Sequence, residues 1–431
     1  MVVSAATTPF SPRGTSIRSL MRSVCEHDDD SVNVDRIKMS APLPRLSAAQ
    51  VAARLGVKPE TVYAYVSRGL LTRERDARGS TFDALEVEAF AAGRRRAAVR
   101  TPTHPTTGMP LGVVQTDVAD IEDDELLYRG RRARDLIPQP FAEVVAWLWN
   151  AERIDAPDPA IGSARAMVEA LPLPAGAMDR LRAALTGFAA DDPLRYDASA
   201  DTAHRIGWTL LTGLPVALGG RPHPDLARSL TSTWTPTADD ATITAVNAAL
   251  VLAIDHDLAV STFAARVAAS ARADGYAAVS AALGAADSPL HISAATRTAR
   301  LLARVNRGQE PERALTDALQ EGNGIPGFGH PLYTGGDDRA AALFPLLAGL
   351  PDGDRTMDAV HRLSEVVAAR TGLLPNVDLA LAALVSGARL PHDAASTIFV
   401  LGRIAGWIAH IAAEYAEPAM RLRPRGEYVG P

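Results

Sequence analysis

The stretch Gly324-Ile325-Pro326-Gly327-Phe328-Gly329-His330-Pro331-Leu332-Tyr333, closely followed by Asp337-Asp338-Arg339, decides how the rest of the chain is interpreted. Its three glycines in six residues permit backbone angles that other residues avoid, and Pro326 stiffens the same loop, so the backbone can approach a ligand closely. His330 adds a titratable imidazole, and Arg339 adds a forked cation that suits a carboxylate. These residue types predict a loop that holds an anion beside a histidine. Taken alone, the pattern also fits a surface turn punctuated by Gly and Pro.

The composition favours a helical protein without disulfides. Of 431 residues, 47% are apolar and only 5% aromatic, and alanine is very common, which indicates closely packed helices. Cys25 is the only cysteine, which excludes an internal disulfide and a cysteine-rich zinc site, and we expect a reducing, cytoplasmic location. No secretion signal is recognisable. No apolar run approaches the ~20 residues that span a bilayer, and the longest, Ala241 to Ile254, is expected to be a buried helix.

Charge divides the chain into a basic amino-terminal part and an acidic remainder. Residues 41–100 carry 11 Arg and Lys against 6 Asp and Glu, a net charge of +5. Residues 101–431 carry 28 against 39, a net charge of −11. Residues 1–40 show neither helical nor strand periodicity, and we expect a disordered tail there.

Residues 41–98 are expected to form a separate basic module. Ser47 and Gln50 make a capping box for a helix that ends at Leu55, and Pro59 suits the start of a second helix that stops before Gly69. A third helix is expected from residue 82 to residue 96. A linker rich in Pro and Thr follows over residues 99–111.

The two short helices resemble the helix-turn-helix of the MerR and excisionase-like families. In the second helix, Val62, Tyr63 and Val66 are expected to form the buried stripe. The resemblance implies that the exposed side faces the DNA major groove, through Lys58, Thr61, Tyr65 and Arg68. Three arginines, at positions 73, 75 and 78, follow in a segment that suits a phosphate-contacting wing. The alternative is a common packing unit with a solvated arginine face.

From about residue 112 the chain resembles the citrate synthase family. The segments Gly-Phe-Gly-His-Pro-Leu-Tyr (residues 327–333) and Asp-Asp-Arg (residues 337–339) are similar to the signature loop of that family. Further segments match in the family's order: Leu126-Leu127-Tyr128-Arg129-Gly130, Asp255-His256-Asp257, Ser288-Pro289-Leu290-His291, Leu374-Pro375-Asn376-Val377-Asp378, Gly402-Arg403-Ile404-Ala405-Gly406-Trp407 and Arg421-Leu422-Arg423-Pro424-Arg425.

The resemblance implies an all-α fold over residues 112–431, with a large helical domain and an inserted small helical domain at about residues 285–385. Successive helices, separated by Pro, Gly and Asp, agree with it. The expected helices are Phe141 to Trp149, Ala160 to Ala170, Asp179 to Ala189, Asp201 to Leu211, Ala241 to Ile254, Ser261 to Ala273 and Ser293 to Asn306. No fixed repeat is present, which argues against a solenoid.

The resemblance also implies the residues that carry chemistry. Asp378 is the expected general base, His291 steadies the enolate, and His330 protonates the new alkoxide. Substrate carboxylates and the keto group are expected at His256, Arg339, Arg403 and Arg423. The last of these reaches across from a partner subunit, so a homodimer is expected. The acyl-CoA is expected at the loop residues Ile325, Pro326, Gly327, Phe328 and Gly329.

The implied reaction is a Claisen-type condensation of acetyl-CoA or propionyl-CoA with oxaloacetate, giving citrate or 2-methylcitrate and CoA. It needs no metal and no redox cofactor. The alternative is a DNA-binding transcription regulator whose synthase-like domain senses an acyl-CoA or keto-acid.

Four positions depart from the family pattern. Glu125 stands near a usual glycine, and Ile292 follows His291 where glycines are usual. Thr334 replaces a Lys or Arg that meets a CoA phosphate, and Asp338 replaces a proline. These departures bear on CoA affinity and on the choice of acyl group.

Overall fold

The computed structural model describes residues 45–76, 79–100, 114–288, 291–321 and 324–424, together with Tyr428 and Gly430. The expected disorder of residues 1–40 lies outside the described residues. So does the expected linker from residue 101 onward. Its first two residues, 99 and 100, belong to a helix.

The amino-terminal module contains one small sheet and three helices. They are β1 (Arg45–Ser47), α2 (Ala48–Leu55), α3 (Pro59–Ser67), β2 (Arg73–Asp76), β3 (Gly79–Asp83) and α4 (Ala84–Arg100). The strands are antiparallel in the order β1-β3-β2. The expected capping box is present, because Ser47 and Gln50 exchange backbone and side-chain hydrogen bonds of 2.8 and 3.3 Å. Gly56, at φ +63°, ends α2 in the left-handed conformation that glycine tolerates best.

Two details of this module differ from the sequence-based prediction. The third helix begins at Ala84, because Phe82 pairs in β3 and the Asp83 carboxylate accepts the Leu85 amide at 2.8 Å as a cap. The buried stripe of α3 is also shifted. Tyr63 is 43% exposed, whereas Tyr65 packs edge-on against Phe90 with ring centroids 5.0 Å apart.

The rest of the described chain is largely helical, as predicted. A second small sheet opens it, with β4 (Ala119–Glu122), β5 (Glu125–Tyr128) and β6 (Arg131–Arg132) in that order. The helices are α5 (Ala133–Leu136), α6 (Phe141–Trp149), α7 (Asp158–Glu169), α8 (Ala177–Ala190), α9 (Ala200–Ala217), α10 (Leu226–Thr231), α11 (Asp240–Leu252), α12 (Val260–Ser270), α13 (Gly275–Ala286), α14 (Ser293–Asn306), α15 (Pro311–Glu321), α16 (Asp338–Leu343), the 3-10 turn η2 (Phe344–Leu346), α17 (Gly353–Thr371), α18 (Val377–Gly387) and α19 (Ala394–Tyr415).

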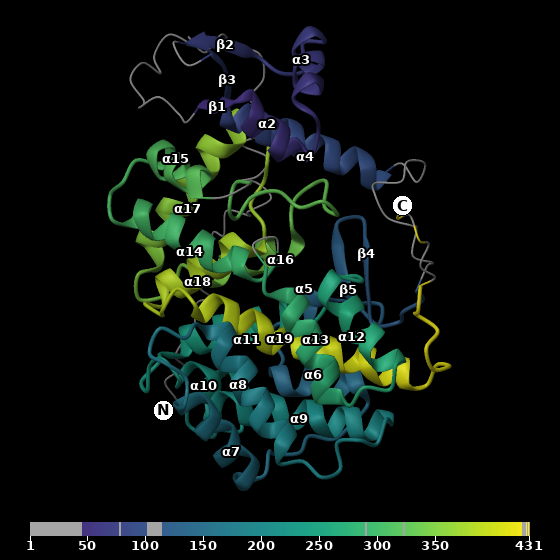
Figure 1. Cartoon of the computed structure of the whole chain (residues 1–431). Coiled ribbons are helices and arrows are strands. Elements are labelled where there is room, and N and C mark those ends of the chain that lie inside the picture. Colours follow the sequence, from purple (N-terminus) through teal and green to yellow (C-terminus); the bar gives the residue numbers. More distant parts are fainter. Residues whose placement is uncertain are drawn as a thin grey trace, which may run out of the picture. The chain divides into compact units, whose positions relative to one another are not determined.

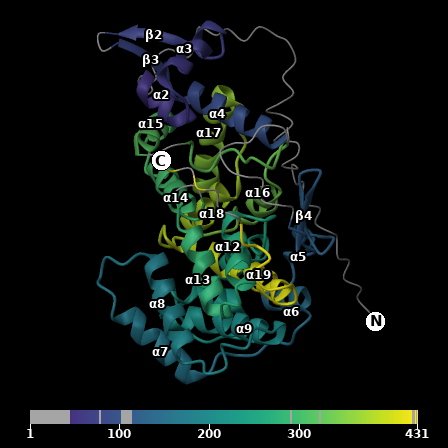
Figure 2. The same cartoon turned by 45° about the vertical axis from the view of Figure 1, so that its right-hand side comes forward.

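Helix α19 is the central element of this part. In both views it crosses between the teal helices α7, α8 and α9 on one side and the green helices α14, α17 and α18 on the other (Figures 1 and 2). Gly402 and Gly406 let it press directly on its neighbour. A β-carbon at these positions would lie 2.6 Å from the Leu250 carbonyl oxygen and 2.1 Å from that of Ile254. Close backbone packing therefore requires glycine at both places.

Helix α19 also corrects the search for apolar runs. An 18-residue window of this 22-residue helix has a mean hydropathy of 1.4, so the helix is long and apolar enough to cross a membrane, and the sequence-based search missed it. The helix is entirely buried inside the protein. It is the core helix of a globular fold, as its many partners indicate.

The amino-terminal module is attached to the helical part by named polar contacts. Arg54 forms an ion pair of 2.6 Å with Glu88 and donates a 2.8 Å hydrogen bond to the carbonyl of Leu319, at the end of α15. Arg370, near the end of α17, pairs with Asp83 at 2.8 Å. The module therefore contacts α15 and α17. Helix α15 precedes the Gly-rich loop (the stretch from Gly324 to Gly336), and α17 precedes the segment that leads to α18.

Candidate active site

The Gly-rich loop is bonded to the chain just before α18. The Gly329 amide donates to the Leu374 carbonyl at 2.8 Å, and the Asn376 amide donates to the Gly327 carbonyl at 3.0 Å. The Asn376 side chain adds a 3.0 Å hydrogen bond to the Gly329 carbonyl. Gly327 has φ +85°, and a β-carbon there would lie 2.6 Å from Thr298, so no larger residue fits.

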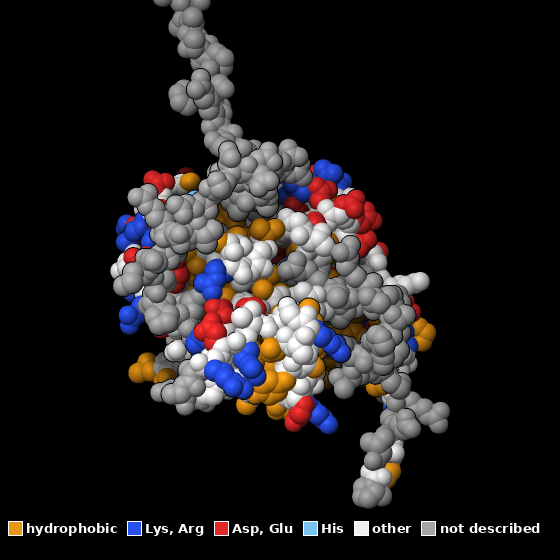
Figure 3. All heavy atoms as spheres, turned by 90° about the horizontal axis from the view of Figure 1, so that it is seen from above, with side chains coloured by type: hydrophobic (Ala, Val, Ile, Leu, Met, Phe, Trp, Pro, Cys, Tyr) orange, Lys and Arg blue, Asp and Glu red, His pale blue; other side chains and the backbone are white. Residues whose placement is uncertain are grey.

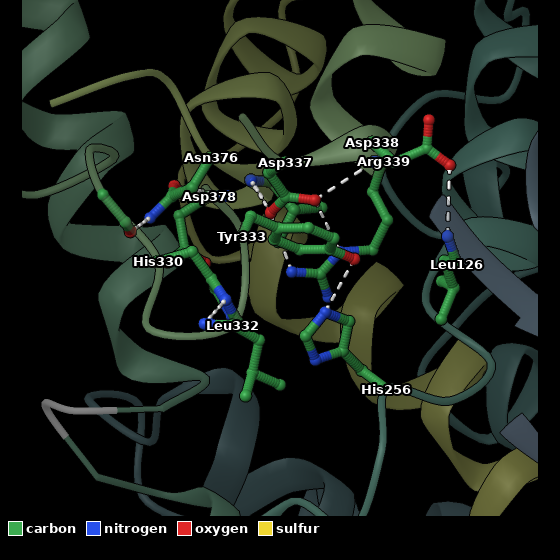
Figure 4. Close-up of polar contacts among 12 residues, drawn as sticks. Leu126, His256, His330, Leu332, Tyr333, Asp337, Asp338, Arg339, Asn376 and Asp378 are labelled. Carbon is green, nitrogen blue, oxygen red and sulfur yellow. Dashed lines mark hydrogen bonds and ion pairs between the residues drawn. The ribbon is translucent and has the colours of Figure 1, made fainter. Parts of the chain in front are cut away.

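Asp337 fixes both the expected substrate arginine and the start of α18. Its carboxylate accepts two hydrogen bonds from the Arg339 guanidinium, at 2.9 and 2.8 Å (Figure 4). It also accepts the Val377 amide at 2.9 Å, which caps the first turn of α18. Burial alone would raise the pKa of Asp337, but the Arg339 charge holds it below its ordinary value. The pair stays ionised at neutral pH.

Asp378 lies in the first turn of α18, next to this capped end. Burial raises the pKa of its carboxyl to about 7, since Arg339 opposes the shift only in part and Asp337 adds to it. A carboxylate with such a pKa takes up a proton readily near neutral pH. This is the property that a general base needs.

His256, His330 and Tyr333 form a cluster of rings beside Arg339, in which His256 and Tyr333 are buried and His330 is half-buried. The His256 and His330 rings meet edge to face with centroids 4.8 Å apart, and His256 Nε2 lies 2.9 Å from the Tyr333 hydroxyl. Burial, with the nearby Arg339 charge, lowers the pKa of His330 to about 4 and that of His256 well below its ordinary value. Both imidazoles are therefore neutral at pH 7 and can donate an N–H without carrying charge.

His291 lies just before α14, and its Nε2 is 2.8 Å from the Ser261 hydroxyl. Its ring meets Phe399 edge to face at 6.1 Å. Burial lowers the pKa of His291 to about 4, with smaller contributions from Arg403 and Arg339. His291 is thus a neutral hydrogen-bond donor or acceptor, oriented by Ser261.

Arg403, on α19, is a buried cation without a carboxylate partner among the described residues. Its Nε donates a 2.8 Å hydrogen bond to the Ala253 carbonyl, and its guanidinium lies 4.7 Å over the Phe399 ring. Burial lowers its pKa to about 10, although the Asp255 charge opposes this. A desolvated cation of this kind favours the binding of an anion.

The structure brings six of the seven predicted catalytic and substrate-binding residues into one neighbourhood. The charge of Arg339 lowers the pKa of His256, His291, His330 and Asp378, and it also acts on Arg403. Figure 4 shows the side chains of His256, Tyr333 and Arg339 directed at one another, and the His330 ring meets both His256 and Tyr333, with centroids 4.8 and 5.0 Å away. A pocket lies beside this group, between the loop from Gly329 to Asp337 and the segment from Gly372 to Pro375.

Arg423 is the predicted residue that this chain does not bring to the site. Its side chain is exposed, in the segment after α19. That segment is tied to the end of α12 by a 2.6 Å hydrogen bond from the Met420 amide to the Ser270 carbonyl. The loop residues expected to contact CoA are arranged differently again. Ile325 and Phe328 are only 5% and 6% exposed, so their side chains lie inside the protein.

Sequence reasoning missed several residues that hold the site. Asp337 stood in the quoted stretch without a role, although it bonds Arg339 and caps α18. His410, one of the largest omissions, is fully buried and pairs with Asp255 at 2.8 Å, next to His256. The only sequence signal for Asp337 and Asp255 was their position near residues predicted to bind substrate, Arg339 and His256. Within the described ranges, no group of three or more His, Cys, Asp or Glu is placed to hold a metal ion.

Comparisons with known proteins show which family this chain is similar to. The family model "Citrate synthase, C-terminal domain" matches residues 107–425. The 2-methylcitrate synthase 1 of Corynebacterium glutamicum is 30% identical over 346 residues, which are 72% of this chain and 90% of that protein. The 2-methylcitrate synthase 2 of the same organism is 28% identical over 344 residues, with the same coverage.

A solved structure supports the fold. It is the citrate synthase of the thermophilic archaeon Thermoplasma acidophilum, in ternary complex with carboxymethyl coenzyme A and oxaloacetate. It matches with a TM-score of 0.63 and 24% identity, over 75% of this chain and 95% of that one. With a family model that covers most of the chain and relatives matched over nine tenths of their length, the chain belongs to the citrate synthase family.

Proposed function

We propose that this protein condenses a short acyl-CoA, acetyl-CoA or propionyl-CoA, with oxaloacetate and releases citrate or 2-methylcitrate and CoA. The relatives named above are 2-methylcitrate synthases, and the site contains an acid–base set suited to carbon–carbon bond formation. The observation that carries the proposal is a half-buried carboxyl with a pKa of about 7 near two neutral imidazoles and two buried arginines.

The proposed reaction assigns one proton transfer to each of two residues. Asp378 takes a proton from the carbon next to the thioester carbonyl, and His291 donates a hydrogen bond to the enolate oxygen that forms. The enolate carbon attacks the keto carbon of oxaloacetate. His330 gives its N–H proton to the new alkoxide, and the proton that Asp378 has taken up restores it, so both residues return to their starting state. Water then hydrolyses the thioester, which releases CoA.

The buried arginines provide the proposed binding site for the keto-acid. Arg403 has no carboxylate partner in the described part of the chain, whereas Arg339 is already paired with Asp337. An incoming carboxylate should therefore bind most strongly to Arg403. Arg339 should attract it less, because its charge is already partly neutralised by Asp337. We expect His256 to donate a hydrogen bond to the keto oxygen. Its Nε2 lies 2.9 Å from the Tyr333 hydroxyl, which supports a fixed orientation of the ring.

CoA release is the direct test. The protein is incubated with oxaloacetate and either acetyl-CoA or propionyl-CoA, and free thiol is measured with time. We expect release that depends on both substrates, and the faster acyl-CoA identifies the physiological acyl group. Absence of release with either acyl-CoA would contradict the proposed reaction.

We propose a homodimer in which Arg423 completes the site of the partner subunit. Val260 and Val267 are seven residues apart on one face of α12 and are 61% and 37% exposed, an apolar face that a second copy would cover. The segment that carries Arg423 is bonded to the end of the same helix.

Subunit mixing tests the shared site. Asp378→Asn and Arg423→Gln homodimers are each expected to be inactive. After exchange of subunits at equal concentration, about a quarter of the parent's active sites should be restored, because half of the dimers are mixed and each contains one complete site. No recovery, with exchange shown by mass spectrometry, would place Arg423 outside the partner's site.

We also propose that residues of about 285–385 form a smaller helical lobe. The helices α14, α15, α17 and α18 pack on one another, which supports this boundary. Limited proteolysis should cut near both limits before it cuts within the lobe.

We propose that the amino-terminal module is a helix-turn-helix that binds DNA, in addition to the enzymatic activity. Support comes from α2 and α3 joined through the left-handed Gly56, and from the hairpin β2–β3 with exposed Arg73 and Arg75. Lys58 and Arg68 are exposed and Thr61 is half-buried, but Tyr65 packs under Arg94 and against Phe90. Figure 3 looks down on this end and shows Lys and Arg side chains in separate groups with Asp and Glu between them.

Binding to mixed-sequence duplex DNA tests the module. We expect weak binding whose affinity falls steeply with salt, and a smaller salt dependence in Lys58→Ala and Arg68→Ala. Tyr65→Phe should behave as the parent, because its ring is held inside the module. Binding that is absent, or that salt does not change, would contradict DNA contact.

A further inference from the structure

The turn between β4 and β5 grips the end of the Gly-rich loop. Asp124, at φ +63°, is the second residue of this two-residue turn. One of its carboxylate oxygens accepts the Thr334 amide at 2.7 Å, and the other accepts the Thr334 hydroxyl and the Gly335 amide, both at 2.7 Å. Three donors converge on one carboxylate, an arrangement typical of a bound anion.

A second carboxylate ties the same two segments together in the opposite direction. Asp338 accepts the Leu126 amide at 3.4 Å and pairs with Arg134 at 2.9 Å. Arg134 also pairs with Glu125 at 2.5 Å. Three of the four positions that depart from the family pattern, Glu125, Thr334 and Asp338, therefore take part in one contact.

The gripped segment leads directly to the groups that act on substrate. Thr334 and Gly335 are followed by Gly336, at φ +114°, and then by Asp337. Two successive glycines lose much conformational entropy when they are ordered, so the segment needs an external anchor. Asp337 in turn bonds Arg339 and the Val377 amide, beside Asp378.

We propose that the β4–β5 turn is a clasp on the Gly-rich loop, and that Asp124 is a positioning residue which fixes Arg339 and Asp378 through Asp337. Asp124 does not touch substrate. It holds the loop in the position in which the arginine and the general base face the same ligand. This inference rests on the proposed function, because it assigns Asp124 to the same site.

The chain supplies a matched control for this proposal. Asp123 precedes Asp124 in the same turn, at φ +48°, and is exposed. Asparagine tolerates the left-handed conformation at both positions. Asp124→Asn places an amide against donors and breaks the clasp, whereas Asp123→Asn changes the turn's charge by the same amount and leaves the clasp intact.

The first experiment measures kcat and KM for oxaloacetate in the parent, Asp124→Asn, Asp123→Asn, Thr334→Val and Thr334→Ser. We expect Asp124→Asn to raise KM about tenfold, which is the scale of one lost charge-assisted hydrogen bond. We also expect a change in the pH below which kcat falls, because Asp124 no longer fixes the position of Asp378. Thr334→Val should have a smaller effect in the same direction, and Thr334→Ser should restore the parent value. Asp123→Asn should stay within about twofold of the parent.

A double variant separates positioning from general damage. If the clasp is one unit, Asp124→Asn with Thr334→Val is no worse than Asp124→Asn alone. Independent, additive effects would overturn the proposal, as would equal KM values for Asp124→Asn and Asp123→Asn. Thermal unfolding of every variant should match the parent closely, since both turn residues lie at the surface.

The second experiment does not need turnover. Hydrogen exchange of the amides of residues 334–337 should become faster in Asp124→Asn and not in Asp123→Asn. Unchanged exchange in Asp124→Asn would overturn the clasp. If the parent releases no CoA, the proposed function fails, and calorimetric binding of oxaloacetate to the same variants then replaces KM as the measure of positioning.

Discussion

The amino-terminal module and the neighbourhood of the Gly-rich loop use charge in opposite ways. In the module, Lys58, Arg68 and Arg73 lie at the surface, and a nearly buried pair, Arg54 with Glu88, faces the helical part. Around the loop, Asp337, Arg339 and Arg403 are almost completely buried, and the pKa of several neighbours is shifted. Surface charge interacts with a partner at long range, whereas buried charge needs a specific ligand or counter-ion at short range.

The largest effect is expected from the general base. Asp378→Asn removes the proton acceptor while it keeps the size of the side chain, so turnover should fall by about 10³-fold or more. Asp354→Asn, an exposed acid in the first turn of α17, is the matched control and should keep full activity. DNA binding by the module should be the same in both variants. If Asp378→Asn keeps the turnover of the parent, Asp378 is not the general base, and the site near the Gly-rich loop does not carry out the proton transfer.

The next largest effect is expected at Arg403. Arg403→Gln should raise KM for oxaloacetate about 30- to 100-fold, the scale of losing a hydrogen-bonded charge. Because this cation has no carboxylate partner in the described chain, its removal also relieves a buried charge, and the midpoint of thermal unfolding should stay level or rise. A variant that loses both stability and binding would show that Arg403 has a structural role instead.

The pH dependence follows from the raised pKa of Asp378. Below pH 7 the carboxyl is protonated and cannot act as a base, so kcat should fall as pH drops from 7 to 5, by about tenfold per unit. His291 and His330, with pKa values of about 4, should add no step in this range. A kcat profile that is flat between pH 5 and 8 would contradict a base with this pKa.

The same carboxyl of Asp378 should affect folding stability with a pH dependence opposite to that of kcat: ionisation favours catalysis but destabilises the fold. The folded-state pKa of Asp378 is raised, so its half-buried carboxyl favours folding fully below pH 3.8, and this contribution is lost as pH rises through 7. At pH 8 the ionised carboxylate costs about 4 kcal/mol, because the unfolded and folded pKa values differ by about 3 and each pH unit corresponds to about 1.36 kcal/mol. Asp378→Asn should therefore unfold at higher denaturant than the parent at pH 8, and the difference should vanish near pH 4.

The smallest effects are expected where the module meets the helical part. Arg54→Gln leaves Glu88 nearly buried without its partner, and it should lower the free energy of unfolding of the module by about 2 kcal/mol or more. Arg370→Gln breaks a more exposed pair with Asp83 and should cost less than about 1 kcal/mol. Denaturant unfolding of both variants measures the two losses of unfolding free energy. Equal losses would contradict the distinction between the buried and the exposed ion pair.

The same contrast explains how much was predictable. Local rules gave α2 and the start of α3 at their observed bounds, because the capping box of Ser47 and the proline at position 59 act within a few residues. The short hairpin β4–β5 was missed, since its turn is Asp123-Asp124 rather than a recognised glycine turn. The convergence of Asp378, His291 and His330 came only from the family resemblance. Spacing alone cannot show that residues 87 positions apart share one neighbourhood.

Helix α19 has a consequence for how the protein is made. The helix occupies residues 394–415 of 431, yet it packs against helices from α6 onward. Until this segment has left the ribosome, the earlier helices lack the surface on which they close, and their apolar sides stay open to chaperones or to other chains. Assembly of the helical core thus waits for α19, and a polypeptide ended before residue 394 should aggregate rather than fold.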